Sequence, residues 1–246
     1  MRHSLTLAAV AAAAVGGNAM AGIITQWTFE GDTTNASSGS GAASLIGGTT
    51  ATFASGNAGG RGWNTTAYQA QGAGSGQAGV RFLVSTASAG GGFDGISVSF
   101  DQRASGTGSR WAQVDYTLDG GTNWVTGFWN NGGGLSPHDS FYSFTVDFSS
   151  VSGANNNAGF GFRIVSIFSP QSFNQNSTLS YGGDTAYMRA NADANYSGTA
   201  GVGGGNYGTG GTWRFDNVTI SGNLIPAPGA IALVGLAGLV TTRRRK

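Results

Sequence analysis

The 246-residue sequence contains no cysteine, which excludes a disulfide framework, a thiolate metal site and a cysteine nucleophile. Charged residues make up only 9% of the chain, and the four prolines without a Gly-X-Y period exclude a collagen-like helix. Glycine is abundant at 45 residues, yet 39% of the residues are hydrophobic and 11% aromatic, which is enough to bury a core. The length fits one β-rich domain with two terminal appendages.

The N-terminus has the features of a secretory signal peptide. A basic start precedes an apolar run over residues 5–15, and Ala19 and Ala21 form the small-x-small pattern that signal peptidase cuts. This apolar run is too short to cross a bilayer. We therefore predict that residues 1–21 form a signal helix removed by signal peptidase, and that the protein is exported.

The C-terminus, residues 223–246, carries a second targeting segment. A Pro-x-Pro-Gly motif is followed by an apolar run over residues 230–240 and then by a basic end. The motif consists of Pro226, Ala227, Pro228 and Gly229, and the basic end of Arg243, Arg244, Arg245 and Lys246. As a helix the apolar run would cover roughly 16 Å of a hydrocarbon core of about 30 Å, so it is a marginal transmembrane helix whose cations stay cytoplasmic.

This tail resembles the PEP-CTERM sorting signal of exported bacterial proteins, with Ala227 where that signal usually has glutamate. The resemblance implies that exosortase, a membrane protease, recognises the tail. The protein would then be tethered to the membrane in transit and delivered to the cell surface or the extracellular matrix. A plain membrane anchor that is never processed is the alternative.

Removing both ends reverses the sign of the net charge. The whole chain carries +1, whereas residues 22–222 hold seven arginines, no lysine and all eleven acidic residues, a net charge of −4. Nucleic-acid binding requires a basic face for the phosphates, so nucleic acid is not expected as a partner. The absence of lysine from this body also excludes a phosphate-binding loop with its lysine.

Alternation of apolar and polar residues dominates residues 22–222 and predicts an all-β fold. In residues 95–102, Ile96, Val98 and Phe100 alternate with polar residues, which places the apolar set on one face of a sheet. The same alternation recurs in residues 80–84, 112–118, 142–148 and 160–164.

An opening strand near residues 23–30 and a closing strand near 212–220 suggest that the two ends of the body lie on neighbouring strands. We therefore predict an antiparallel, jelly-roll-like β-sandwich. Two long segments, 54–78 and 169–211, are expected to interrupt the strands. The predicted core residues are Phe100, Val114, Phe144 and Phe162.

Residues 117–124, Thr-Leu-Asp-Gly-Gly-Thr-Asn-Trp, predict a tight hairpin. Asp-Gly-Gly supplies the positive φ angles, Asp119 bonds the following backbone and Trp124 covers the turn. The motif resembles an Asp-box hairpin, with Asn123 where that pattern usually has threonine. The resemblance implies a structural role.

Residues suited to catalysis are scarce. Glu30 is the only glutamate and is predicted on the opening strand, so no glutamate pair for glycoside hydrolysis can form. His138 is predicted in an exposed turn and is the only histidine after the signal segment, so a two-histidine zinc site is excluded. The sequence also lacks the Gly-x-Ser-x-Gly motif of a serine nucleophile. We therefore predict a protein that is not an enzyme and has no cofactor, with an aspartate-based hydrolase as a further alternative.

Oxygen ligands suited to calcium are abundant in the loops, but no calcium-binding loop sequence is present. Asp32, Asp94 and Asp184 are predicted to cap turns, with calcium ligation as the alternative. Arginines in or beside the strands are expected to form cross-strand ion pairs with nearby aspartates. These arginines are Arg103, Arg110, Arg163 and Arg214, and the aspartates are Asp101, Asp115 and Asp216.

Two functions suit this body. It resembles the exported jelly-roll proteins that often carry such a tail, which implies a non-enzymatic cell-surface or matrix component; the matching segments are 48–53, 62–66, 99–103, 162–166 and 212–218. The alternative is a carbohydrate-binding module whose exposed aromatic residues stack on the sugar rings of an extracellular polysaccharide. The candidate ligand-binding residues are Trp63, Trp129, Tyr181 and Tyr196.

Overall fold

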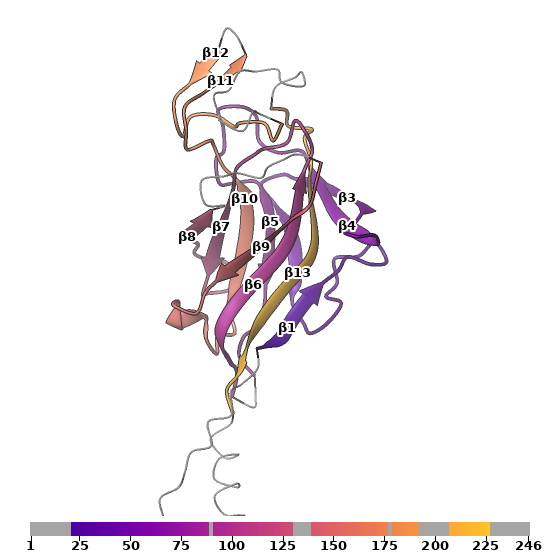
Figure 1. The fold of residues 1–246 in the computed structure, drawn as a ribbon. Coiled ribbons are helices and arrows are strands. Elements are labelled where there is room, and N and C mark those ends of the chain that lie inside the picture. Colours follow the sequence, from indigo (N-terminus) through magenta and orange to yellow (C-terminus); the bar gives the residue numbers. More distant parts are fainter. Residues whose placement is uncertain (1–20, 89–90, 130–138, 177–178, 192–206, 227–246) are drawn as a thin grey trace, which may run out of the picture.

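The computed structural model describes residues 21–88, 91–129, 139–176, 179–191 and 207–226. In this part of the chain two antiparallel sheets pack face to face, which confirms the predicted all-β sandwich (Figure 1). The predicted signal helix and C-terminal hydrophobic helix lie outside the described residues. Within those residues, no helix has the length and hydrophobicity needed to cross a bilayer.

The first sheet contains both ends of the body. Its strand order is β3-β4-β13-β6-β9, and β1 also pairs with β13. The strands are β1 (Gly22–Trp27), β3 (Thr50–Ser55), β4 (Arg61–Thr66), β6 (Phe93–Ala104), β9 (Tyr142–Asp147) and β13 (Trp213–Leu224). Gly22 on β1 lies opposite Gly222 on β13, so the prediction that the two ends occupy neighbouring strands is confirmed.

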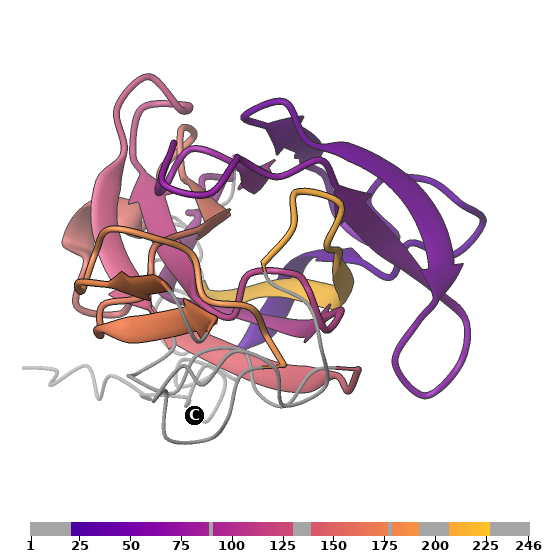
Figure 2. The same cartoon turned by 90° about the horizontal axis from the view of Figure 1, so that it is seen from above.

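The second sheet has the order β2-β5-β10-β7-β8. Its strands are β2 (Ala42–Ile46), β5 (Gly79–Leu83), β7 (Ala112–Thr117), β8 (Val125–Trp129) and β10 (Gly161–Ser166). A small hairpin of β11 (Phe173–Asn176) and β12 (Leu179–Tyr181) lies at one end of the sandwich, and the described body ends at the other (Figure 1). Viewed from above, the indigo-to-purple part of the chain lies on the flank opposite the pink β7–β8 hairpin (Figure 2).

Aromatic side chains fill the space between the sheets. Phe82 stacks on Phe162 with ring centroids 4.9 Å apart, and Trp27 packs against Phe82 at 5.0 Å. Of the predicted core residues, Phe100, Val114 and Phe162 are buried as expected. Phe144 is partly buried and stacks on Phe100, because β9 is the edge strand of its sheet.

Several predicted boundaries are wrong. Strand β1 ends at Trp27, so Glu30 lies in a turn; the positive φ angles of Phe29 and Asp32 are incompatible with a continuing strand. Asp94 lies within β6 and caps no turn.

The segments predicted to interrupt the strands contain strands themselves. The end of β3 and all of β4 lie in residues 54–78, and β11 and β12 lie in residues 169–211. Strand β4 contains glycine and asparagine, which have low β-propensity, but pairing on both sides with β3 and β13 overrides that preference.

The Asp119 hairpin forms as predicted. The carboxylate of Asp119 accepts bonds from the Asn123 backbone N–H at 2.9 Å and from its side-chain amide at 2.7 Å, and these bonds lower the pKa of Asp119 to about 2. Trp124 closes the turn by donating its indole N–H to the Gly121 carbonyl at 3.1 Å, and its ring lies 4.8 Å from the Arg163 guanidinium. The motif therefore fixes the hairpin on the second sheet.

Candidate functional site

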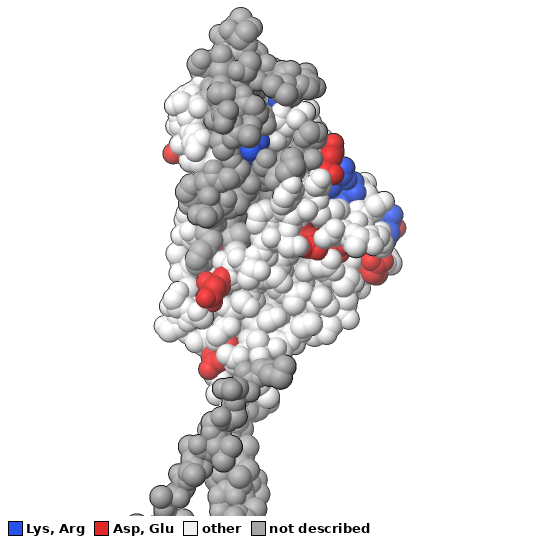
Figure 3. Space-filling model, in the orientation of Figure 1, with Lys and Arg blue, Asp and Glu red and all other residues white. Residues whose placement is uncertain are grey.

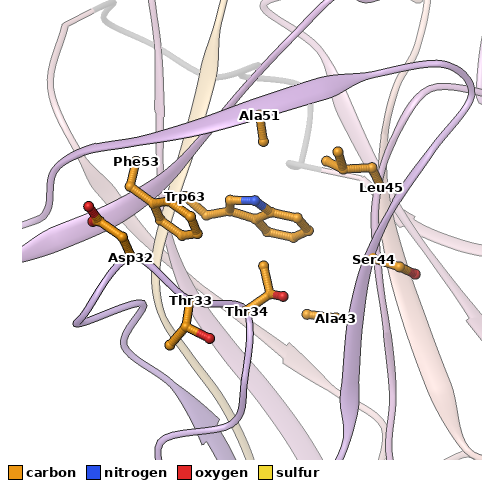
Figure 4. A pocket seen from close by; sticks show the side chains of 9 residues that line it. All are labelled: Asp32, Thr33, Thr34, Ala43, Ser44, Leu45, Ala51, Phe53 and Trp63. Carbon is orange, nitrogen blue, oxygen red and sulfur yellow. The ribbon is translucent and has the colours of Figure 1, made fainter.

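The sandwich is open along one side, where the edge strands of the two sheets face each other. Strand β2 is the edge of the second sheet and β3 the edge of the first, and residues 47–49 connect them. Between them lies a groove of about 450 Å³ (Figure 4). Its lining residues are Asp32, Thr33, Thr34, Ala43, Ser44, Leu45, Ala51, Phe53 and Trp63.

Trp63 forms the floor of the groove. It projects inward from β4, is only 3% exposed, and is held between Phe29, stacked at 5.6 Å, and the edge of Phe82 at 6.3 Å. Figure 4 shows its ring crossing the middle of the lining, between Phe53 and Leu45. Rigid packing on both neighbours fixes the indole in this position.

The indole nitrogen of Trp63 forms no hydrogen bond with any described residue. Buried indole N–H groups usually have an acceptor, and two other tryptophans of this chain show such a bond. Trp27 donates to the Thr34 carbonyl at 3.1 Å and Trp213 to the Ser109 carbonyl at 2.7 Å. The Trp63 N–H is therefore a donor free for a molecule in the groove.

The walls of the groove are largely apolar. Inward-facing positions of β2 contribute Ala43 and Leu45, and those of β3 contribute Ala51 and Phe53. Ser44 points its hydroxyl away from the groove, and the oxygen accepts a bond from Arg81 Nε at 2.8 Å (Figure 4). Both strands also present unpaired edges, since neither has a second neighbour in its sheet among the described strands.

The polar end of the groove is held by an ion pair. Arg61 donates two bonds to Asp32, Nε to Oδ1 at 2.5 Å and Nη2 to Oδ2 at 3.0 Å, and Nη2 also donates to the Phe53 carbonyl at 3.1 Å. This bond to Asp32 is the main reason why the pKa of Arg61 is raised. Thr33 and Thr34 follow Asp32 and also line the groove, and the Thr33 hydroxyl accepts a bond from the Asn35 backbone N–H at 3.1 Å.

This arrangement suits binding. An aromatic and apolar floor beside hydroxyl groups and free strand edges complements a molecule with flat apolar faces and a rim of hydroxyls. Asp32 is the one carboxylate in the described lining, and both of its oxygens are engaged by Arg61. Among the described residues, no cluster of three or more histidines, cysteines or acidic residues could hold a metal.

The structure does not bring the predicted ligand-binding residues together. Trp63 lies in the groove, but the prediction that it is exposed is wrong, because its position on β4 faces the core. Trp129 ends β8, opposite Gln113, on the far edge of the second sheet. Tyr181 ends β12 and packs against the small cluster of Trp111, Ala186 and Met188.

Other predicted residues lie outside the described part of the chain. They are Ala19, Tyr196, His138, Ala227, Pro228, Gly229, Arg243, Arg244, Arg245 and Lys246. Ala21 is the first described residue, and Pro226, the last, is exposed.

Sequence reasoning missed Phe53 and Thr34 as site residues. The alternation in Thr-Ala-Thr-Phe could have placed Ala51 and Phe53 on one face, but not opposite β2.

No protein-family model and no curated protein matches this chain. Among solved structures, it is similar to a tandem of family 22 carbohydrate-binding modules from Paenibacillus barcinonensis Xyn10C, with 12% identity, a TM-score of 0.44 and 87% of this chain covered. The chain spans about half of that tandem, 52% of its length.

Two further solved structures are similar at the level of the fold. One is the single xylan-binding CBM22-1 domain of the same Paenibacillus protein, with 10% identity and a TM-score of 0.44, covering 84% of this chain and 96% of that one. The other is a family 11 carbohydrate-binding module from Clostridium thermocellum in complex with a β-1,3-1,4-mixed-linked tetrasaccharide. It has 11% identity and a TM-score of 0.38, and the match covers 82% of this chain and 99% of that one.

Proposed function

We propose that this protein binds carbohydrate in the groove between β2 and β3. The observation that carries the proposal is the floor of the groove, where Trp63 is rigidly packed but keeps an unused indole N–H. Sugar rings have an apolar face that packs on aromatic side chains and hydroxyl groups that accept such a bond. Because Trp63 is only 3% exposed, the aromatic surface on which a ring can pack is that of Phe53, which is partly buried and lines the groove.

The polar groups of the groove suit a neutral saccharide. Thr33 and Thr34 supply hydroxyls, and the free edges of β2 and β3 supply backbone N–H and C=O groups. Because Arg61 neutralises Asp32, the groove presents no unpaired charge from its described lining. The protein would hold a sugar chain without cleaving it, as a binding component and not as a hydrolase.

Saccharide binding should depend on the side chains that line the groove more than on adjacent residues that face away from it. We expect Phe53→Ala to weaken binding of xylohexaose or of a mixed-linkage β-glucan tetrasaccharide by roughly tenfold, because an anchoring aromatic surface is lost. Thr34→Val should weaken it by about threefold through loss of one hydroxyl bond, while the carbonyl that accepts from Trp27 stays in place. Isothermal titration calorimetry measures both effects.

The matched control is Thr52→Ala. Thr52 is the neighbour of Phe53 on β3, is exposed, and faces the opposite side of the sheet, where it lies across from Asn64. This variant should bind like the unaltered protein. Equal affinities for Phe53→Ala and Thr52→Ala would rule out the groove as the binding site.

We also propose that the protein is exported and sorted through its C-terminal tail to the cell surface or matrix. The order of Pro-x-Pro-Gly motif, apolar run and basic end supports this location. Gly22 and Gly222 are strand neighbours, so both appendages join the body at one end, and β3 and β4 lie on its flank away from that end (Figure 1). A tethered body would therefore leave the groove accessible.

Processing of the tail has a definite mass signature. We expect the mature protein to begin at Gly22 and to end near Pro228, because the motif would lie at the membrane surface where the protease acts. Intact-mass spectrometry of the protein from its final location measures both ends. Replacing Pro226 and Pro228 by alanine should leave a membrane-bound precursor, and a mature wild-type species that retains Lys246 would reduce the tail to an anchor.

A further inference from the structure

Two arginines face each other on the outer surface of the first sheet. Arg214 on β13 lies opposite Arg103 on β6, and Asn64 on β4 is the partner of Arg214 on its other side. The prediction that these arginines pair with Asp101 and Asp216 is wrong, whereas the predicted pair of Arg163 with Asp115 forms at 2.8 Å. The inward-facing residues set the register of β6 and β13, and this register places base opposite base and acid opposite acid.

The acidic pair, Asp101 and Asp216, is satisfied within the protein. Asp101 accepts bonds from the side-chain amides of Asn57 at 3.0 Å and Asn217 at 2.8 Å, and from the Ser143 hydroxyl. Asp216 accepts from the backbone N–H groups of Asn57 and Asn217, both at 2.7 Å. All four carboxylate oxygens have donors, so this pair leaves no requirement for a ligand.

The basic pair is not satisfied in the same way. Arg103 donates through Nη2 to Asp139 at 2.6 Å, while its Nε is buried with no acceptor among the described residues. Arg214 donates through Nε to Asn64 at 3.2 Å and through Nη1 to the Ser55 carbonyl at 2.8 Å. Several guanidinium N–H groups therefore remain available, and like charges placed directly opposite each other destabilise a sheet.

A small pocket lies over this pair. Its volume is about 190 Å³, and its lining residues are Asn64, Arg103, Ser105, Thr212 and Arg214, without a carboxylate. Burial, and after it the nearby Arg103, lower the pKa of Arg214, while Asp139 acts in the opposite direction. Figure 3 shows few charged side chains on the visible face of the body; some blue ones lie beside red ones on the right flank, and others lie near the top.

We infer that this pocket binds the carboxylate of a uronic acid residue in an acidic polysaccharide. The planar guanidinium fork matches a carboxylate, and Asn64, Ser105 and Thr212 are the neutral polar residues that suit sugar hydroxyls. The saccharide part of this inference rests on the proposed function, whereas the anion part stands on the arginine pair alone. The pocket is separate from the groove, because Asn64 and Trp63 are consecutive on β4 and face opposite sides.

Asp139 is the internal competitor of such a ligand. The Asp139 side chain is 54% exposed and forms an ion pair with Arg103. An incoming carboxylate would therefore compete with Asp139 for the Arg103 guanidinium. Removing the Asp139 charge should thus strengthen binding, while removing an arginine charge should weaken it. Tighter binding on loss of the Asp139 charge and weaker binding on loss of an arginine charge would distinguish an anion site from general destabilisation of the protein.

The test is calorimetric titration of the purified protein with free glucuronate, trigalacturonate, a sulfated trisaccharide and xylohexaose. We expect Arg103→Gln and Arg214→Gln each to weaken trigalacturonate and glucuronate binding by about tenfold or more, because each removes charge-assisted bonds. Arg214→Lys should recover only part of this loss, since lysine keeps the charge without the fork. Asp139→Asn should tighten binding by several-fold.

Arg81→Gln is the charge-matched control, because Arg81 lies on the second sheet, where it bonds Ser44. Equal losses in Arg81→Gln and Arg214→Gln, or binding of the sulfated trisaccharide but not of trigalacturonate, would overturn the inference. Xylohexaose binding lost in Phe53→Ala but kept in Arg214→Gln would support two separate sites. Glucuronate binding that depends on Arg214, with no xylohexaose binding at all, would refute the groove and retain the anion pocket.

Discussion

Replacement of Phe162 by alanine is expected to lower the free energy of unfolding by about 3–5 kcal/mol. Phe162 is fully buried in β10, the central strand of the second sheet, and stacks on Phe82 at 4.9 Å. With no disulfide in the chain, the loss approaches the whole stability of a marginal domain. Urea denaturation followed by tryptophan fluorescence measures the change.

Phe144→Ala is the matched control for this loss. Phe144 lies on the edge strand β9 and is only partly buried, so its truncation removes less packing and should cost clearly less. A Phe162→Ala variant as stable as Phe144→Ala would contradict the assignment of the core. Reducing agents should leave both variants and the parent unchanged.

Replacement of Gly79 by alanine is the second change with a large expected effect. Gly79 lies in β5 between Ile46 of β2 and Val165 of β10, and a Cβ placed there would overlap the backbone carbonyl of Ile164. Two strands would have to move apart, because backbone atoms cannot rotate away as a side chain can. We expect at least about 3 kcal/mol of destabilisation, with partial loss of soluble protein.

Gly210→Ala is the control for Gly79→Ala. A Cβ at Gly210 would meet no atom within 4 Å, and its backbone is not in the left-handed region. It should be neutral within about 0.5 kcal/mol in the same urea titration. Equal stability of the two variants would show that the close approach of β5 and β10 is absent.

The alternation of apolar and polar residues predicted those strands in which one face is buried and the other is exposed to solvent. Residues 95–100 show this clearly, because β6 alternates partly exposed and buried positions there, whereas Asp101 and Gln102 are both buried. Strand β4 was missed because Gly62 and Asn64 flank Trp63 and hide the alternation, and its strand conformation depends on pairing with β3 and β13. Local propensity holds no information about such pairing.

The groove and the arginine pair depend on relations between distant segments. The groove lining comes from a turn after β1 and from β2, β3 and β4, and its position follows from which strands form the sheet edges. The opposition of Arg103 and Arg214 follows from strand register, which single-residue patterns do not specify. The residue types suggested that aromatic side chains bind sugar. Only the fold places Trp63 in the floor of the groove and separates it from Trp129 and Tyr181.

Binding of a sugar chain in the groove over Trp63 can be followed through the indole N–H resonances of the six tryptophans. In a ¹H–¹⁵N titration with xylohexaose, we expect a saturable shift of the Trp63 signal, because its N–H has no acceptor among the described residues and would gain one. The signals of Trp124 and Trp213, already bonded to Gly121 and Ser109, should stay in place. A shift confined to the signal of Trp129, on the far edge of the second sheet, with the Trp63 signal unchanged would show that the groove is not the binding site.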